Sequence, residues 1–169
     1  MKRFFTLVLT VTAVTLAAGT DLRIDGKFRN VANGLPSNWS ISAPGAARIV
    51  GGEEWFSRAL QLTANTGAVT ATTKNSFPVT IYDTVEMEAE IKGSGTAFLA
   101  VELLDANGKV LAVKRIAAAT ATARFRDLKG SLRIRDCAQY APAAIRLVCG
   151  AAPGSTVTFD DIDAELDRD

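Results

Sequence analysis

Histidine is absent from this sequence, and its absence excludes the most common general base and the most common zinc ligand. The sequence also lacks a Gly-x-Ser-x-Gly elbow, a phosphate-binding loop and a Cys–His pairing. Neighbouring carboxylates do occur, and glycoside hydrolysis needs only two of them at a suitable separation. Acidic pairs are nevertheless common on protein surfaces, and nothing in the sequence places one in a cleft. We therefore predict that the chain is not an enzyme.

A charge excess of either sign is absent as well. Nineteen Lys and Arg residues nearly balance eighteen Asp and Glu residues, which leaves a formal net charge of +1. Nucleic acids and anionic membrane surfaces attract proteins that carry an excess of basic residues. The composition therefore predicts neither of them as a partner.

Long hydrophobic runs are missing except at the N-terminus, where MKRFFTLVLTVTAVTLAAGTDL has a basic tip, an apolar stretch over 4–16 and then small residues. This is the layout of a secretory signal peptide with cleavage after Gly19. A membrane anchor is the alternative, but the apolar stretch is shorter than the roughly 20 residues that span a bilayer. No cysteine stands at the cleavage region to carry a lipid. The sequence predicts a signal peptide over 1–19, a secreted, periplasmic or extracellular location without a membrane span, and one domain over 20–169.

Cysteine is scarce, with only Cys137 and Cys149 in the chain. Two cysteines in an exported protein are expected to pair with each other. A disulfide across so short a loop would stabilise the fold by about 3 kcal/mol in the chain-entropy model. The alternative is a pair of buried free thiols, because the sequence does not supply the geometry that a disulfide needs.

Strand-like alternation, rather than a helical period, runs through the rest of the chain. Short alternating runs separated by Gly, Asn, Asp and Pro predict an all-β fold, an antiparallel β-sandwich. DANG at 105–108 predicts a tight hairpin, because Asn and Gly tolerate positive φ, and GSG at 93–95 predicts a second one. The predicted strands cover residues 58–64, 68–74, 84–93, 96–105, 109–116, 121–128, 131–136, 144–150 and 156–166.

Charged residues occupy the polar positions of several predicted strands. In TVEMEAEIKG the side chains of Glu86, Glu88 and Glu90 point away from the apolar ones. Arginines hold the polar positions of later strands, at Arg124, Arg126, Arg133, Arg135 and Arg146. One interpretation is a solvated sheet face with cross-strand ion pairs. The other is a polar groove that hydrogen-bonds sugar hydroxyls or a uronic acid.

Three segments together resemble carbohydrate-binding modules with the galactose-binding-like jelly-roll fold. LRIDGKFRNVANGLPSNWS (22–40) resembles their opening NGxFE…GLPxxW pattern, and YDTVEMEAEIKGSGTAFLAVELLDANGKVL (82–111) resembles their paired central strands. PGSTVTFDDIDAEL (153–166) resembles their closing strand, which commonly ends in an FDD or DDV pattern. The resemblance covers most of the chain after the predicted signal peptide. It implies a jelly-roll domain that binds a polysaccharide or oligosaccharide.

The closing segment changes its register at an acidic pair. Apolar residues before Asp160 and after Asp161 have opposite parity, which is the effect of one extra residue in a strand, a β-bulge. In the modules that the chain resembles, an acidic residue here commonly helps to hold a structural calcium ion together with the glutamate of NGxFE. Calcium needs six to eight oxygen ligands. This chain has Arg29 at the glutamate position, and an arginine cannot ligate a cation, so we expect Arg29 to form an ion pair with Asp160 or Asp161 in place of the metal. The alternative is a retained structural calcium ion with Asp160 and Asp161 among its ligands.

Sugar recognition usually uses an exposed aromatic face with polar groups beside it. Trp55 lies in the polar loop GGEEWFSRA, and Tyr140 lies in DCAQYAP, which the disulfide would brace. We predict Trp55 and Tyr140 as ligand contacts, with Glu54 and Gln139 as their polar neighbours. The alternative is that Trp55 only covers one end of the sandwich. No strand shows an outward stripe of aromatics, which argues against a groove for a long glycan chain.

The predicted function is that of an exported, non-catalytic carbohydrate-binding domain, and the carbohydrate is what the resemblance implies. A second hypothesis is a structural or protein-interaction module at the cell surface, which binds a protein partner and no glycan. A third is a polysaccharide-active enzyme with carboxylate catalysis.

Overall fold

The structure is a computed structural model that describes residues 19–168, so nearly all of the predicted signal peptide lies outside the described residues. Residues 19–168 form fourteen strands and two short 3-10 helices, η1 and η2. Their bounds are β1 (Thr20–Asp21), β2 (Val31–Ala32), β3 (Leu35–Pro36), β4 (Trp39–Ile41), η1 (Pro44–Ala46), β5 (Ala47–Gly51), β6 (Arg58–Ala64), β7 (Val69–Thr73), β8 (Phe77–Pro78), β9 (Asp83–Ser94), β10 (Thr96–Leu104), β11 (Val110–Thr120), β12 (Arg126–Arg133), η2 (Ile134–Tyr140), β13 (Ala144–Ala151) and β14 (Ser155–Arg168).

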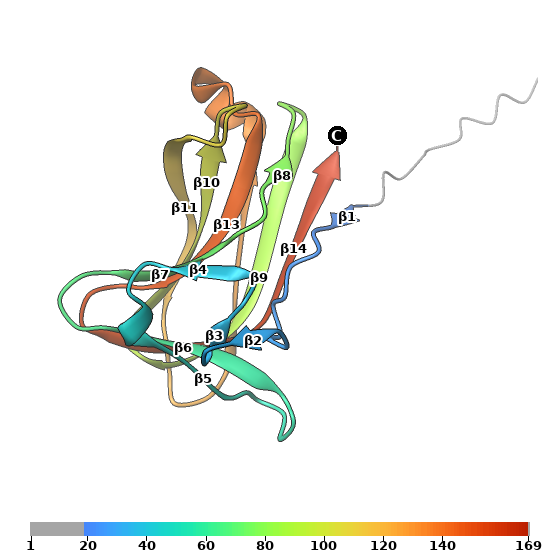
Figure 1. Cartoon of the computed structure of the whole chain (residues 1–169). Coiled ribbons are helices and arrows are strands. Elements are labelled where there is room, and N and C mark those ends of the chain that lie inside the picture. Colours follow the sequence, from blue (N-terminus) through green and yellow to red (C-terminus); the bar gives the residue numbers. More distant parts are fainter. Residues whose placement is uncertain (1–18, 169) are drawn as a thin grey trace, which may run out of the picture.

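Two antiparallel sheets face each other, as the sequence predicts (Figure 1). The first sheet has the order β12-β9-β14-β6-β5, and β1 adds to β14. The second sheet has the order β11-β10-β13-β7-β4, and β8 adds to β13. Neighbours within each sheet are far apart along the chain, as in β9 and β14, so the fold depends on long-range pairing. No helix in residues 19–168 is long and apolar enough to cross a membrane.

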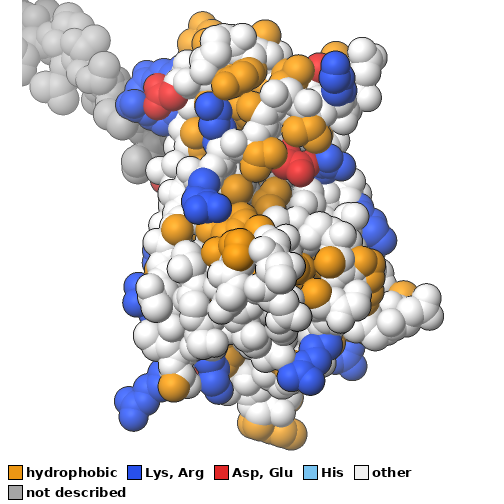
Figure 2. Space-filling model, turned by 90° about the vertical axis from the view of Figure 1, so that its left-hand side faces the viewer, with side chains coloured by type: hydrophobic (Ala, Val, Ile, Leu, Met, Phe, Trp, Pro, Cys, Tyr) orange, Lys and Arg blue, Asp and Glu red, His pale blue; other side chains and the backbone are white. Residues whose placement is uncertain are grey.

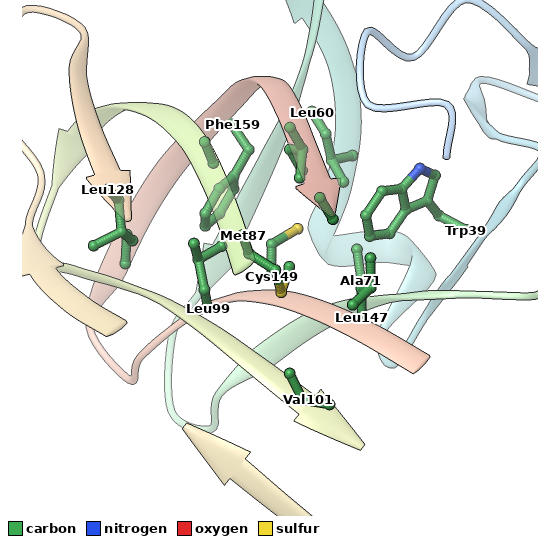
Figure 3. Close-up of a cluster of buried hydrophobic side chains, with 14 of the residues drawn as sticks. Trp39, Leu60, Ala71, Met87, Leu99, Val101, Leu128, Leu147, Cys149 and Phe159 are labelled. Atoms are coloured by element: carbon green, nitrogen blue, oxygen red, sulfur yellow. The ribbon is translucent and has the colours of Figure 1, made fainter. Parts of the chain in front are cut away.

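The core lies between the two sheets and is made by the alternating apolar residues of each strand. Met87 of β9 and Phe159 of β14 come from the first sheet, and Leu99 of β10 comes from the second (Figure 3). Trp39 is buried at one side of this cluster, and its indole N–H donates to the carbonyl of Asp25 at 3.1 Å. A buried Trp with a satisfied N–H is a structural residue, so Trp39 does not serve as a ligand platform.

Most of the predicted strands and one of the two predicted hairpins are confirmed. DANG joins β10 to β11, with the Asp105 carboxylate accepting from the backbone of Asn107 and Lys109, and with Gly108 at φ 80°. GSG at 93–95 does not form a hairpin, because β9 belongs to the first sheet and β10 to the second. The turn carries the chain across the sandwich instead. The predicted strands 121–128 and 131–136 are wrong in their bounds, since one strand, β12, is followed by η2.

The predicted bulge in the closing strand is confirmed. Asp160 of β14 pairs with Glu90 of β9, and Asp163 pairs with Glu88, so β14 contains one residue more than its partner over this stretch. Asp161 is the residue with a left-handed backbone, at φ 44°. Because of the extra residue, apolar side chains of both parities face the core: Val157, Phe159, Ile162, Ala164 and Leu166.

The predicted disulfide is wrong, since Cys137 and Cys149 are both free and buried. Cys137 lies on η2, which packs against β9 and β12. Cys149 lies five residues after Ala144, the first residue of β13. Five residues of a strand extend over roughly 16 Å. A disulfide requires Cα atoms within about 7 Å of each other. Burial raises the pKa of the Cys149 thiol to about 12, so this thiol stays protonated inside the core (Figure 3).

The acidic face predicted for β9 exists, but its ion-pair partners differ from the prediction. Glu88 pairs with Lys129 of the neighbouring strand β12, with 2.6 Å between the Lys Nζ and the carboxylate. Among residues 19–168, no arginine forms a salt bridge with the glutamates of β9. Arg146 instead pairs with Glu102 on the second sheet, at 2.7 Å.

Candidate functional site

A cavity of about 430 Å³ opens beside the bulge of β14. It lies between the loop that joins β5 to β6, residues 52–57, and the segment that precedes β2. Five of its residues are acidic and three are basic. We call it the bulge pocket, and its lining is Lys27, Arg29, Glu53, Glu54, Phe56, Ser57, Arg58, Glu90, Asp160 and Asp161.

Asp160 holds the β5–β6 loop in place. Its side chain is 3% exposed, and one carboxylate oxygen accepts from the backbone N–H of Glu53 at 2.9 Å and from the hydroxyl of Ser57 at 3.2 Å. The other oxygen accepts from the backbone N–H of Asp161 at 2.9 Å. A buried carboxylate needs such donors, because burial removes its hydration. The first acidic residue of the bulge therefore fixes the position of the loop that carries Trp55.

Asp161 is bound by the N-terminal segment. Its carboxylate lies 3.1 Å from the Nζ of Lys27, and this ion pair raises the pKa of Lys27. The backbone N–H of Ile162 also donates to the carbonyl of Gly26, at 3.2 Å. The ion pair that we expected of Arg29 is wrong in its residue, since the cationic group beside the bulge is the ammonium of Lys27. The sequence DGKFR places Lys27 and Arg29 two residues apart, and only the fold decides which of them reaches the carboxylate.

The residues of the bulge do not fit a calcium ion. The oxygens of Asp160 accept three hydrogen bonds from the protein, and Asp161 faces a cation that the chain itself supplies. Within residues 19–168 there is no cluster of three or more Asp, Glu, Cys or His side chains arranged to hold a metal ion. A calcium site needs six to eight oxygens, so an ammonium that occupies the same position leaves no complete ligand set.

Chelation is therefore expected to leave the melting temperature unchanged. We expect the same thermal unfolding curve in excess calcium and in excess EDTA, at constant ionic strength, measured by circular dichroism. Replacement of Lys27 by Met removes the cation but leaves its aliphatic stem, and we expect that variant to be less stable. A melting temperature that rises with calcium in the unsubstituted protein would contradict this description of the bulge.

Glu90 is the most perturbed carboxyl group of the bulge pocket. Burial raises its pKa to about 7, and the charge of Glu53 and a hydrogen bond with it add to the effect. Asp160, directly opposite on β14, contributes further repulsion. Glu90 is thus partly protonated at neutral pH and offers both a donor and an acceptor to the pocket.

Two aromatic side chains lie at the rim of this pocket. Trp55 is 94% exposed, and Phe56, also exposed, lines the cavity. Their rings are 5.4 Å apart between centroids and meet edge to face, at 86°. Glu54, the predicted polar neighbour of Trp55, lines the same cavity. Of the four predicted ligand residues, Glu54 therefore lines this pocket, and Trp55 lies just outside the lining with its ring against that of Phe56.

Other residues of the bulge pocket were not predicted from the sequence, namely Lys27, Glu53, Phe56, Ser57 and Arg58. Each is a close neighbour in the sequence of a residue that was predicted, Arg29 or Trp55. The missing information was spatial, because the loop after β5 meets β14 across about a hundred residues of sequence.

No family model matches this sequence, and no curated protein matches it. Several solved structures are similar to this chain. The CBM22-1 xylan-binding domain of Xyn10C from Paenibacillus barcinonensis is 22% identical, covers 90% of this chain and 97% of its own, and superimposes with a TM-score of 0.61. A tandem of two such domains, CBM22-1 and CBM22-2 of the same protein, is 20% identical over 93% of this chain and 48% of its own, with a TM-score of 0.61.

The chain has the jelly-roll fold of carbohydrate-binding modules. A cyclase from Fischerella sp. TAU, 9% identical, has a similar fold, with a TM-score of 0.67 over 89% of this chain and 98% of its own. The same carbohydrate-binding-module fold thus also carries an enzyme. Identities this low show the fold, and the ligand has to be argued from the site.

The other two predicted ligand residues lie at the opposite end of the carbohydrate-binding-module fold. Tyr140 ends η2, the helical turn at the top of Figure 1, whereas the β5–β6 hairpin is at the bottom. The ammonium of Lys114 lies 4.7 Å from the centroid of the Tyr140 ring and 3.4 Å from its hydroxyl oxygen. Gln139 is exposed beside it. The structure therefore does not bring Tyr140 and Gln139 together with Trp55.

The outer face of the second sheet is another surface of this fold. Hydrophobic side chains gather there between Lys and Arg side chains (Figure 2), and Val113 of β11 is an exposed one. Its aromatic residue, Phe98, is only 6% exposed, because the ring lies over Gly150 and the guanidinium of Arg115 lies 4.4 Å from the ring centroid. Phe98 packs on the outer side of the sheet with Ala100 and Val148, apart from the main core. In the part of the chain that the structure describes, this face has no free aromatic surface for stacking, unlike the bulge pocket.

Proposed function

We propose that the domain binds a carbohydrate without catalysing a reaction on it, and that the sugar binds in the bulge pocket. The observation that carries this proposal is the exposed indole of Trp55 at the rim of a polar cavity. An indole that is 94% exposed has no role in packing, and glycan sites combine such an aromatic surface with polar groups that orient the sugar. Glu54 and Glu90 supply polar groups of this kind.

We also propose that the domain acts outside the cytoplasm. The support is the sequence pattern over residues 1–19, which is typical of a secretory signal peptide. An exported domain of this fold would bring its own chain, or a protein that contains it, to a polysaccharide.

Replacement of Trp55 by Ala is expected to abolish retention of the domain on its polysaccharide and to leave the melting temperature unchanged. The reason is that the ring contributes stacking area to a sugar and almost no packing to the fold. The measurement is native affinity electrophoresis through gels that contain soluble polysaccharides, beginning with xylans.

Tyr82→Ala is the matched control, because Tyr82 is an exposed aromatic residue away from the bulge pocket. The Tyr140→Ala variant distinguishes a ligand bound at the η2 end of the molecule from a ligand bound at the bulge pocket. Loss of retention with Tyr140→Ala, and not with Trp55→Ala, would place the ligand at η2. Uniform mobility through a broad panel would favour a protein-interaction module instead, and release of reducing sugar would favour an enzyme.

A further inference from the structure

Two arginines of the bulge pocket have no carboxylate partner. Within residues 19–168, neither Arg29 nor Arg58 forms a salt bridge, although the same cavity contains five acidic residues. Both side chains are exposed, and a guanidinium Nη1 of Arg58 donates to the backbone carbonyl of Arg29 at 3.2 Å. This bond holds Arg58 against the segment that carries Arg29, so the two arginines line one side of the pocket together.

Most acidic groups of the pocket are engaged with other parts of the protein. Asp161 is paired with Lys27, and Asp160 accepts hydrogen bonds from the loop. Glu90 carries a full negative charge only when the pH rises above about 7. The positive charge of the two arginines is therefore opposed mainly by the exposed carboxylates of Glu53 and Glu54. The arginines themselves indicate a ligand that carries an anionic group of its own.

The neighbouring side chains restrict the chemistry of that ligand. A guanidinium binds a carboxylate through two parallel hydrogen bonds, a geometry that an ammonium does not match. Phe56 and Trp55 supply apolar ring faces next to the same cavity. A ligand that binds both the guanidinium groups and the aromatic rings has a carboxylate on a ring with an apolar C–H face. Hydroxyl groups on the same ring can donate to the carboxylates of the pocket. Uronic acids have this combination.

We infer that the bulge pocket recognises a uronic acid residue of a glycan, with the sugar carboxylate on Arg29 and Arg58 and the sugar ring against Phe56 and Trp55. This inference rests on the proposed function and names the class of sugar that the same site takes. It predicts a preference for acidic over neutral polysaccharides in a protein whose own charges nearly balance.

The experiment compares native glucuronoxylan and polygalacturonate with the same polymers after their carboxylates are reduced to primary alcohols. Affinity is measured by electrophoresis and by titration calorimetry for the unsubstituted protein and for the Arg29→Gln and Arg58→Gln variants. Arg135→Gln is the control, since Arg135 is exposed on η2 at the other end of the molecule. Melting temperatures of all variants establish that each one is folded.

We expect at least one acidic polymer to bind about tenfold or more tightly than its reduced form, with the difference shrinking at high salt. Each pocket variant should lose about tenfold in affinity for the acidic polymer, and Arg135→Gln should lose none. Equal binding of native and reduced polymers, or unchanged affinity in both pocket variants, would overturn the uronic acid inference while the carbohydrate proposal stands. Absence of binding to every polymer tested would overturn both.

Discussion

Replacement of Gly26 by Ala is expected to destabilise the protein by about 3 kcal/mol, which lowers the melting temperature of a domain of this size by roughly 10 °C. A Cβ atom at Gly26 would overlap the backbone carbonyl of Ile162, which belongs to the strand that continues from the bulge. The backbone on both sides of this contact is held in place by a hydrogen bond, because the N–H of Ile162 donates to the carbonyl of Gly26. The overlap can be relieved only if the N-terminal segment moves away from β14.

That movement would also separate Lys27 from Asp161 and displace Arg29, so the variant should lose glycan binding together with stability. Gly67→Ala is the control, since a Cβ there meets no atom within 4 Å. Both variants can be compared by thermal and urea unfolding. Equal stability of Gly26→Ala and Gly67→Ala would show that the N-terminal segment does not pack on the bulge as described.

Replacement of Glu90 by Gln is expected to stabilise the protein above pH 7 and to have little effect near pH 5. The pKa of Glu90 is about 7 in the folded protein against an ordinary value of 4.5, chiefly because of burial and then because of Glu53. Between these two pH values the folded state binds more protons than the unfolded state, so stability falls as the pH rises. The destabilisation by Glu90 reaches its full size once the pH exceeds the folded-state pKa, because the carboxyl group is then ionised in the folded protein.

Glu90 is partly accessible to solvent, so we discount the full shift and expect an effect on the order of 1–2 kcal/mol at pH 8. The measurement is the free energy of unfolding from urea titrations at several pH values between 5 and 8. Because Asp163 and Glu165 also have raised pKa values, the informative quantity is the difference between the variant and the unsubstituted protein. Glu54→Gln, a neutralised exposed carboxylate of the same pocket, serves as the control. Parallel pH profiles for the Glu90→Gln variant and the unsubstituted protein would contradict the assignment.

Only some residues of the candidate site could be predicted from the sequence. Trp55 and Glu54 were selected because an aromatic residue in a polar, glycine-led loop has little reason to be buried, and the structure exposes Trp55. Tyr140 was selected by the same reasoning, but exposure and composition say nothing about which end of a sandwich a loop occupies. Arg29 was expected to meet the acidic pair, and Lys27 meets it instead. Lys27 and Arg29 lie on either side of Phe28, whose backbone is left-handed at φ 49°, and no sequence pattern shows which of the two side chains such a turn directs to the carboxylate.

The sequence by itself determined the features that depend on local periodicity and turn chemistry. Alternation with a period of two predicts the strands and the faces of β9, the parity change at Asp160 predicts the bulge, and DANG predicts its hairpin. The tertiary structure alone decided that GSG crosses between sheets, that Cys137 and Cys149 are both free and buried, and that Asp160 holds a loop whose residues lie about a hundred positions earlier. These outcomes follow from which strands become neighbours. That choice is made by long-range packing, which the local pattern of the chain does not record.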